Sequence, residues 1–167
     1  MWTDRGSFTR REKKRQGDDP GEEVVVTVIV VDICDSVEKG LKLEDFNSFY
    51  HETVPFVLSN GGQLEKFTGD GFIAFWYPDD EDSAITACKM ILQQSPFSCR
   101  IGIATSKAEV GYAVAGDRSD IAVVGEAIVV ASYLRRIARS GEVIRYDRRS
   151  GLQIDIKGKR YGFERET

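Results

Sequence analysis

Short apolar runs bounded by glycine alternate along the chain with longer segments whose apolar residues recur every three or four positions. The run Val24 to Val31 is apolar apart from Thr27, and because it is too short to cross a bilayer it predicts a strand buried on both faces. Two further runs, Gln63 to Thr68 and Phe72 to Trp76, flank the triplet Gly69-Asp70-Gly71 and predict a β-hairpin. The tip of this hairpin therefore presents one carboxylate.

Three segments, residues 43–58, 83–94 and 126–139, carry apolar residues at helical spacing. Pro55 is expected to kink or divide the first helix, and His51 is expected on its surface. The acidic run before the second helix suits the positive end of a helix dipole better than a metal site. The residues expected to pack inward are Phe46, Phe49, Tyr50, Val54, Val57 and Leu58, then Ala84, Ala87, Cys88, Ile91 and Leu92, then Ile128, Val129, Ala131, Ser132, Leu134 and Ala138.

The remaining apolar runs complete a mixed α+β pattern. Strands are expected at Arg100 to Thr105, Val110 to Gly116, Ile121 to Gly125 and Glu142 to Tyr146, and a closing hairpin at Leu152 to Phe163. The order β-α-β-β-α-β, with additional C-terminal strands, is the split βαβ pattern of ferredoxin-like folds. The sequence therefore predicts an α+β, ferredoxin-like domain.

Length and charge indicate one domain and disfavour nucleic-acid-binding and membrane-spanning proteins. The 167 residues are enough for one domain, expected at residues 24–167 after a flexible, basic arm at residues 1–23. A net charge of −4 argues against a general nucleic-acid-binding surface, and no apolar run reaches membrane length. The three cysteines lack metal-ligand spacing, and without a signal-peptide pattern they indicate reduced thiols in the cytoplasm.

Two carboxylates carry the candidate chemistry. Asp32 follows the buried strand directly, so its charge lies beside low-dielectric surroundings and needs a partner. A cation is one such partner. If Asp32 and Asp70 lie on adjacent strands, they can hold two divalent ions between them, which is the arrangement that clamps both oxygens of a phosphoryl displacement.

Three linked segments give the chain a resemblance to class III nucleotidyl cyclase catalytic domains, over roughly residues 24–163. Asp32-Ile33-Cys34 resembles the family's first metal-binding strand end. Lys66-Phe-Thr-Gly69-Asp70-Gly71 resembles the hairpin with the second metal aspartate and a purine-contacting lysine. Arg100-Ile-Gly-Ile, then Val124-Gly125-Glu126-Ala127, then the helix leading to Ser140-Gly141-Glu142 resemble the family's C-terminal half.

The resemblance implies a head-to-tail homodimer whose active sites lie at the interface between the two chains. Each site would cyclise a nucleoside triphosphate with two Mg²⁺ or Mn²⁺ ions. Asp32 and Asp70 would hold the ions, with the Ile33 carbonyl as a further ligand. The 3′-oxygen would attack the α-phosphorus and pyrophosphate would leave. The cyclic product would act on a downstream effector.

The chain departs from the family pattern at three positions. The family helix after Gly125 offers an asparagine and then an arginine that stabilises the transition state, but Val129 and Tyr133 stand there. The base-reading position before the glycine is Ala122, so Lys66 is the one purine-reading residue retained. Arg135 or Arg136 could replace the missing arginine from nearby positions.

These departures favour an enzyme that reads a different base. The short chain and altered base pocket resemble the bacterial pyrimidine cyclases of the Pycsar anti-phage system, which make cyclic UMP or cyclic CMP. Tyr50 could fill the space that a purine needs, or could simply be a core aromatic residue. The alternatives are an adenylate or guanylate cyclase that acts on ATP or GTP, and a degenerate module that only binds. A diguanylate-synthesising relative is disfavoured, because its Gly-Gly-Asp/Glu-Glu/Asp-Phe hairpin is replaced by Gly69-Asp70-Gly71-Phe72.

Overall fold

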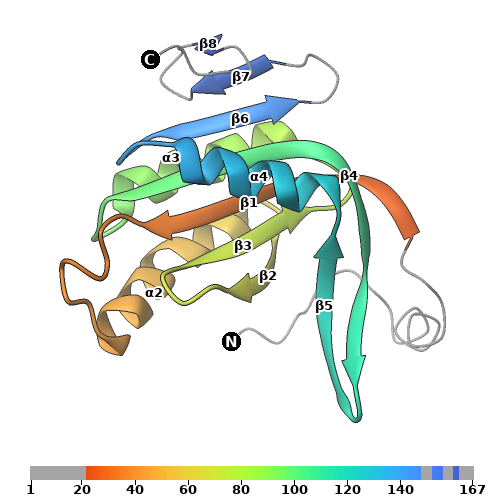
Figure 1. Cartoon of the computed structure of the whole chain (residues 1–167), viewed down its shortest axis with the longest axis horizontal. Coiled ribbons are helices and arrows are strands. Elements are labelled where there is room, and N and C mark those ends of the chain that lie inside the picture. Colours follow the sequence, from red (N-terminus) through yellow and green to blue (C-terminus); the bar gives the residue numbers. More distant parts are fainter. Residues whose placement is uncertain (1–21, 148–151, 156–159, 162–167) are drawn as a thin grey trace.

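One mixed sheet organises the structure, a computed structural model that describes residues 22–147, 152–155 and 160–161. Within these residues the sheet runs in the order β2-β3-β1-β4-β6-β7-β8, and β5 pairs with β4 off this path (Figure 1). The strands are β1 (Glu22–Ile33), β2 (Gln63–Phe67), β3 (Gly71–Trp76), β4 (Cys99–Ala115), β5 (Arg118–Val124), β6 (Val143–Asp147), β7 (Leu152–Asp155) and β8 (Arg160–Tyr161). The helices are α2 (Leu43–Ser59), α3 (Glu81–Gln94) and α4 (Glu126–Ile137).

Strands β1 to β4, with helices α2 and α3 between them, build a ferredoxin-like core, as predicted. Strand β1 lies between β3 and β4 and is antiparallel to both, while β2 pairs antiparallel with β3 at the edge. The resulting order β4-β1-β3-β2 belongs to the β-α-β-β-α-β pattern. Strand β6 then extends the sheet by pairing parallel with β4. The α+β fold class is therefore confirmed.

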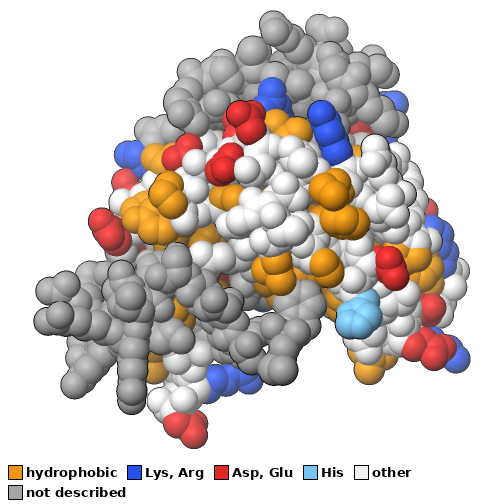
Figure 2. Space-filling model, turned by 180° about the vertical axis from the view of Figure 1, so that it is seen from behind, with side chains coloured by type: hydrophobic (Ala, Val, Ile, Leu, Met, Phe, Trp, Pro, Cys, Tyr) orange, Lys and Arg blue, Asp and Glu red, His pale blue; other side chains and the backbone are white. Residues whose placement is uncertain are grey.

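Helices cover both faces of the sheet, so β1 is buried on each side. Helices α2 and α3 lie on one face and α4 lies on the other (Figure 1). Residues Val26, Val28 and Val31 of β1 are fully buried, as the apolar run predicts. Figure 2 shows the molecule from behind, where its one histidine, His51, is exposed as expected. No helix in the described part of the chain is long and apolar enough to span a membrane.

Helix α4 approaches the sheet closely at Gly102 of β4. A β-carbon built at this glycine would lie 2.1 Å from the Ala131 carbonyl oxygen and 2.4 Å from the Arg135 backbone nitrogen. Real side chains never come this near to backbone atoms, so only glycine lets the helix lie at this depth. The position of Arg135 above the sheet therefore depends on Gly102.

Several element boundaries differ from those expected. Strand β4 is one continuous 17-residue strand, not two, because Ser106 to Glu109 continue the pairing with β1. Helix α2 continues through Pro55 as one helix. The residues Glu22 and Glu23, expected in the N-terminal arm, pair with β4 as the start of β1. Residues 1–21 of that arm and the turn of the closing hairpin lie outside the described residues.

Two predicted inward-facing residues are exposed instead. Leu58 is 44% exposed near the end of α2, and Val129 is 66% exposed on α4. Both follow a helical apolar pattern, but the buried face of α4 consists of Ala127, Ala131 and Leu134. The exposed position of Val129 bears on the site described below.

Replacing Gly102 with alanine is expected to destabilise the fold by about 1–3 kcal/mol, because the added methyl forces α4 away from β4. The melting temperature should fall by several degrees in a thermal-unfolding measurement. The matched control is Gly116→Asn, at a left-handed turn position with open space around it, where asparagine is tolerated. Equal melting temperatures for the two variants would contradict this account of the helix–sheet contact.

Candidate active site

Asp32 is brought to the hairpin tip by the pairing of β1 with its neighbours. It lies opposite Gly71 of β3 and opposite Arg100 of β4, and it is 5% exposed. The backbone N–H of Ile33 donates a 2.8 Å hydrogen bond to the carbonyl oxygen of Asp70. The end of β1 and the tip of the hairpin are therefore joined directly.

The glycines before and after Asp70 are each required, for different structural reasons. Gly69 has a positive φ of 89°, which turns the chain at the tip. Gly71 lies so close to β1 that an added β-carbon would be 1.8 Å from the Val31 carbonyl oxygen. This close approach places the Asp70 backbone beside the Asp32 end of β1.

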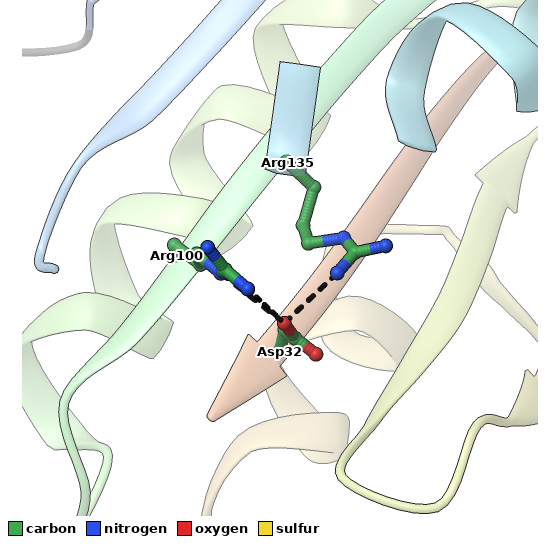
Figure 3. Close-up of polar contacts among 3 residues, drawn as sticks. All are labelled: Asp32, Arg100 and Arg135. Atoms are coloured by element: carbon green, nitrogen blue, oxygen red, sulfur yellow. Dashed lines mark hydrogen bonds and ion pairs between the residues drawn. The ribbon is translucent and has the colours of Figure 1, made fainter. Parts of the chain in front are cut away.

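Two arginines bind the Asp32 carboxylate in this structure (Figure 3). Atom Nη1 of Arg135 lies 3.0 Å from Oδ2 of Asp32. Arg100 approaches the same oxygen with Nε at 3.2 Å and Nη2 at 3.1 Å. These pairs compensate the charge of a carboxylate whose side chain is only 6% exposed. The sequence predicted Arg135 near the chemistry but did not single out Arg100 as a partner of Asp32.

Asp70 lies beside Asp32, because the next residue, Gly71, pairs with Asp32 and the Asp70 carbonyl oxygen accepts from Ile33. Burial raises the pKa of Asp70, and the neighbouring Asp32 carboxylate raises it further, while Arg135 acts in the opposite direction. Like charges raise the pKa of a carboxyl group only at close range. The predicted convergence of the two aspartates is therefore present.

The donor set at this point suits divalent cations that arrive with phosphate. In the described part of the chain no group of three or more His, Cys, Asp or Glu side chains is placed to hold a metal. Mg²⁺ commonly binds through one or two carboxylates and completes its coordination with substrate phosphates and water. Asp32 and Asp70 meet this requirement, and Ile33 lies at the same strand end.

Lys66, the predicted base-contacting residue, is paired with its neighbour Glu65. The Lys66 Nζ lies 3.2 Å from Glu65 Oε1, and the Lys66 side chain is 58% exposed whereas that of Glu65 is 3% exposed. Burial raises the pKa of Glu65, although the pairing with Lys66 and the backbone of Val123 lower it. The second Glu65 oxygen is buried and has no hydrogen-bond partner. Ala122, half-buried on β5, adjoins Val123 and therefore lies near this pair.

Glu65 was not predicted from the sequence to lie beside Lys66, because strict alternation would place it on the opposite side of β2. The pairing of β2 with β3 shifts register between Leu64 and Lys66, which is a bulge-like irregularity. Such a shift re-aims side chains locally and is compatible with neighbouring residues on one side. No sequence signal in this strand indicates the shift.

Tyr50 braces the hairpin from α2. Its hydroxyl donates a 3.1 Å hydrogen bond to the carbonyl oxygen of Gly69, and its ring centroid lies 4.3 Å from that of Phe67. Burial raises the pKa of Tyr50, and so does the nearby charge of Asp70. These residues border a mainly apolar cavity of about 750 Å³. Its lining residues are Leu43, Glu44, Phe46, Asn47, Ser48, Tyr50, His51, Phe67 and Gly69.

Helix α4 separates the two candidate arginines. Arg136 is exposed, with its guanidinium carbon 5.9 Å from the centroid of the Tyr133 ring. Val129 and Tyr133 are 66% and 41% exposed, so all three follow one outward stripe at helical spacing. Arg135 instead reaches Asp32 of its own chain. In this single chain the outward stripe is therefore separate from the Asp32 site.

Solved structures of cyclases share this fold. The adenylyl cyclase CyaB from P. aeruginosa is 26% identical, with a TM-score of 0.63 over 75% of this chain and 78% of that chain. The guanylyl cyclase Cya2 is 21% identical, with a TM-score of 0.63 over 77% of each chain. The guanylate cyclase domain of RhGC from Catenaria anguillulae, solved with GTP, is 16% identical, with a TM-score of 0.65 over 75% and 80%.

No protein-family model matches the chain, and no curated protein matches its sequence. The structural likenesses establish the fold of class III cyclase catalytic domains.

The buried carboxylate of Glu65 predicts a pH dependence of stability. Because its folded pKa is raised, the folded chain binds more protons than the unfolded chain between the ordinary glutamate value, about 4.3, and the raised value. The stability contribution of Glu65 therefore falls as pH rises through that window. Glu65→Gln should remove this decline, so its melting temperature should gain on that of the wild type as the pH rises.

Thermal unfolding of both proteins across this pH range measures the effect. The control is Glu38→Gln, a change at an exposed glutamate, which should leave the pH profile unaltered. A constant difference between Glu65→Gln and wild type at every pH would refute the assignment.

Proposed function

We propose that this chain is a nucleotidyl cyclase that converts a pyrimidine nucleoside triphosphate, UTP in preference to CTP, into its 3′,5′-cyclic monophosphate and pyrophosphate. The observation that carries the proposal is the convergence of Asp32 and Asp70 at one strand end of a cyclase fold. Two structural carboxylates gain nothing by lying together, because each raises the free energy of the other's charged form. A shared pair of cations explains the arrangement.

The site residues would hold two Mg²⁺ or Mn²⁺ ions through Asp32, Asp70 and the Ile33 carbonyl. Such ions, when bound, lower the pKa of the attacking 3′-hydroxyl and offset charge on the triphosphate. The chain's own contribution is to fix both carboxylates through the Ile33–Asp70 backbone bond and the close approach at Gly71. This rigidity orients the ligands without requiring reorganisation during the reaction.

Base selection is assigned to Lys66, Ala122 and Tyr50. A lysine ammonium can only donate hydrogen bonds, so Lys66 favours a base edge that carries a carbonyl oxygen. Uracil offers O4 at its edge, whereas cytosine carries an amino group there, and this supports UTP over CTP. The methyl of Ala122 gives a purine edge no polar contact, and the Tyr50 ring beside the hairpin restricts the space for a second ring.

The outward stripe of α4 is assigned to the partner chain's active site in a head-to-tail homodimer. Val129 and Tyr133 leave large apolar surface exposed in the single chain, which a second copy would cover. Arg136, held over the Tyr133 ring, is then the arginine available to the neighbouring triphosphate. Arg135 acts in its own chain at Asp32. The product would be a second messenger for a downstream effector in bacterial anti-phage defence, a role that rests on the subgroup resemblance alone.

An adenylate or guanylate cyclase is the second candidate, and one observation favours it. The ion pair of Lys66 with Glu65 combines a donor and a carboxylate acceptor, which is a combination that can also read adenine or guanine. This candidate keeps the same metal site and differs only in the base. A degenerate binding module is less favoured, because it would not require the paired aspartates.

The proposal predicts cyclic UMP as the main product when the purified chain is incubated with UTP, CTP, ATP and GTP in the presence of Mn²⁺. Asp32→Asn and Asp70→Asn should each lower turnover at least about a hundredfold, because each removes a charged metal ligand while keeping its shape. Mass spectrometry of the four reaction mixtures identifies the products.

The matched control is Asp120→Asn, at an exposed carboxylate on β5. Cyclic AMP or cyclic GMP as the main product would replace the pyrimidine assignment while keeping the cyclase. Unchanged turnover in Asp32→Asn or Asp70→Asn would end the two-metal assignment.

A shared active site predicts complementation between two inactive chains. A chain with Asp70→Ala lacks a metal ligand, and a chain with Arg136→Ala lacks the arginine offered to the partner, so mixing them restores one intact site per heterodimer. Activity should recover towards about one quarter of wild type from random pairing. Turnover is measured against the mixing ratio, and sedimentation reports the oligomeric state. A fully active monomer would rule out the shared site.

A further inference from the structure

We propose that Arg135 takes the place of a divalent cation at Asp32 while nucleotide is absent, so that the site loads metal only together with a triphosphate. The inference rests on the proposed function and specifies how its metal site is filled. Arg135 is thus a positioning residue, which acts through Asp32, and its effect is on metal affinity.

One oxygen of the Asp32 carboxylate, Oδ2, already accepts hydrogen bonds from two arginines. Nη1 of Arg135 lies 3.0 Å from Oδ2 of Asp32, and Nε and Nη2 of Arg100 lie 3.2 and 3.1 Å from the same oxygen (Figure 3). The carboxylate side chain is 6% exposed, so a cation cannot approach this oxygen freely from solvent. A metal that binds Oδ2 must displace a guanidinium group.

Arg135 is the arginine placed to leave. Arg100 lies directly opposite Asp32 across the β1–β4 pairing, so the ladder fixes its backbone beside the carboxylate. Arg135 comes from the last turn of α4 and reaches Asp32 through one nitrogen. The side chains of Arg135 and Arg100 are 27% and 32% exposed, so the two arginines differ in their number of contacts to Asp32 and not in exposure.

The contacts of Arg135 are also incomplete. Its Nε is buried without a hydrogen-bond partner, although a guanidinium carries five N–H donors in a planar fork. A buried, unpaired donor raises the free energy of this conformation. A phosphate can accept two parallel hydrogen bonds from the same fork, so a bound triphosphate offers Arg135 a more complete set of partners.

The balance of charges in the site also favours joint binding of metal and triphosphate. The positive charges of Arg100 and Arg135 match the negative charges of Asp32 and Asp70, so the site is neutral before any ligand binds. A divalent cation alone would leave a buried excess of positive charge, which is unfavourable in a low dielectric. A triphosphate brings about as much negative charge as two divalent cations bring positive charge, so joint binding restores neutrality.

The test measures Mn²⁺ binding to the full chain by electron paramagnetic resonance of free Mn²⁺, with and without a non-cyclisable α,β-methylene analogue of UTP. Wild type should bind Mn²⁺ weakly alone and at least about tenfold more tightly with the analogue. Arg135→Ala should bind Mn²⁺ alone at least about tenfold more tightly than wild type, because it removes one positive charge from the site. Adding Asp32→Asn to Arg135→Ala should abolish this gain.

The matched control is Arg139→Ala, which removes an exposed arginine that follows α4 and should leave the binding of Mn²⁺ alone unchanged. Circular dichroism checks folding, and Arg135→Gln, which keeps most of the side chain, repeats the measurement if Arg135→Ala unfolds. Unchanged or weaker Mn²⁺ affinity in the folded Arg135 variant would overturn the inference, and so would equal Mn²⁺ affinity of wild type with and without the analogue.

These outcomes separate the inference from the proposed function. Cyclic nucleotide formation combined with unchanged Mn²⁺ affinity in Arg135→Ala would keep the cyclase and overturn the inference. Analogue-dependent Mn²⁺ binding in wild type and tighter binding of Mn²⁺ alone in Arg135→Ala, combined with no cyclic product from any nucleotide, would support the inference for a binding module. Failure of Mn²⁺ to bind under any condition would overturn both.

Discussion

The backbone pairing of β1 with β3 and β4 is the constraint on which the rest of the site depends. It places the penultimate residue of β1, Asp32, between Gly71 on one side and Arg100 on the other. The hydrogen bond from Ile33 to Asp70 then ties the hairpin tip to the same point. A shift of one residue in this register would turn the Asp32 side chain to the other face of the sheet. Apolar burial of β1 on both faces therefore serves the chemistry indirectly, because it holds the register.

Close backbone contacts at two glycines position the charged residues around Asp32. Gly71 lets the hairpin strand meet β1 without a side chain between them, and Gly102 lets α4 lie deep enough on β4 to bring Arg135 over the sheet. Gly71 sets the distance of the like charge, Asp70, from Asp32. Gly102 sets the position of the opposite charge, Arg135. The electrostatic balance of the site therefore depends on backbone packing as well as on ionisable residues.

The sequence predicted the elements that depend on local patterns and missed those that depend on tertiary contact. The alternating and helical periods located β1, the hairpin, the three helices and the ferredoxin-like order, because each follows from burial of one apolar face. The split of β4 was wrong, since Ser106 to Glu109 look like a turn locally but are held extended by pairing with β1. The Glu65–Lys66 pair and the Arg100–Asp32 pair were missed for a related reason. They depend on a register irregularity and on a cross-strand partner 68 residues away.

The fold explains where the two aspartates lie, whereas a preference for one base depends on individual side chains. The shared architecture accounts for the positions of Asp32 and Asp70, but one fold hosts many specificities, so a base preference depends on side chains that the fold does not fix. Ala122 on β5 offers no polar side-chain atom, while Glu65 places a carboxylate beside Lys66 on β2. The two changes oppose each other for a purine, because one removes an acceptor and the other supplies one. One Glu65 oxygen is paired with Lys66 and the other is buried without a hydrogen-bond partner, whereas the Lys66 side chain is 58% exposed. In the proposed cyclase, this exposed donor is the reason to expect an oxo base, and the Tyr50 ring beside the hairpin is the reason to expect the smaller one.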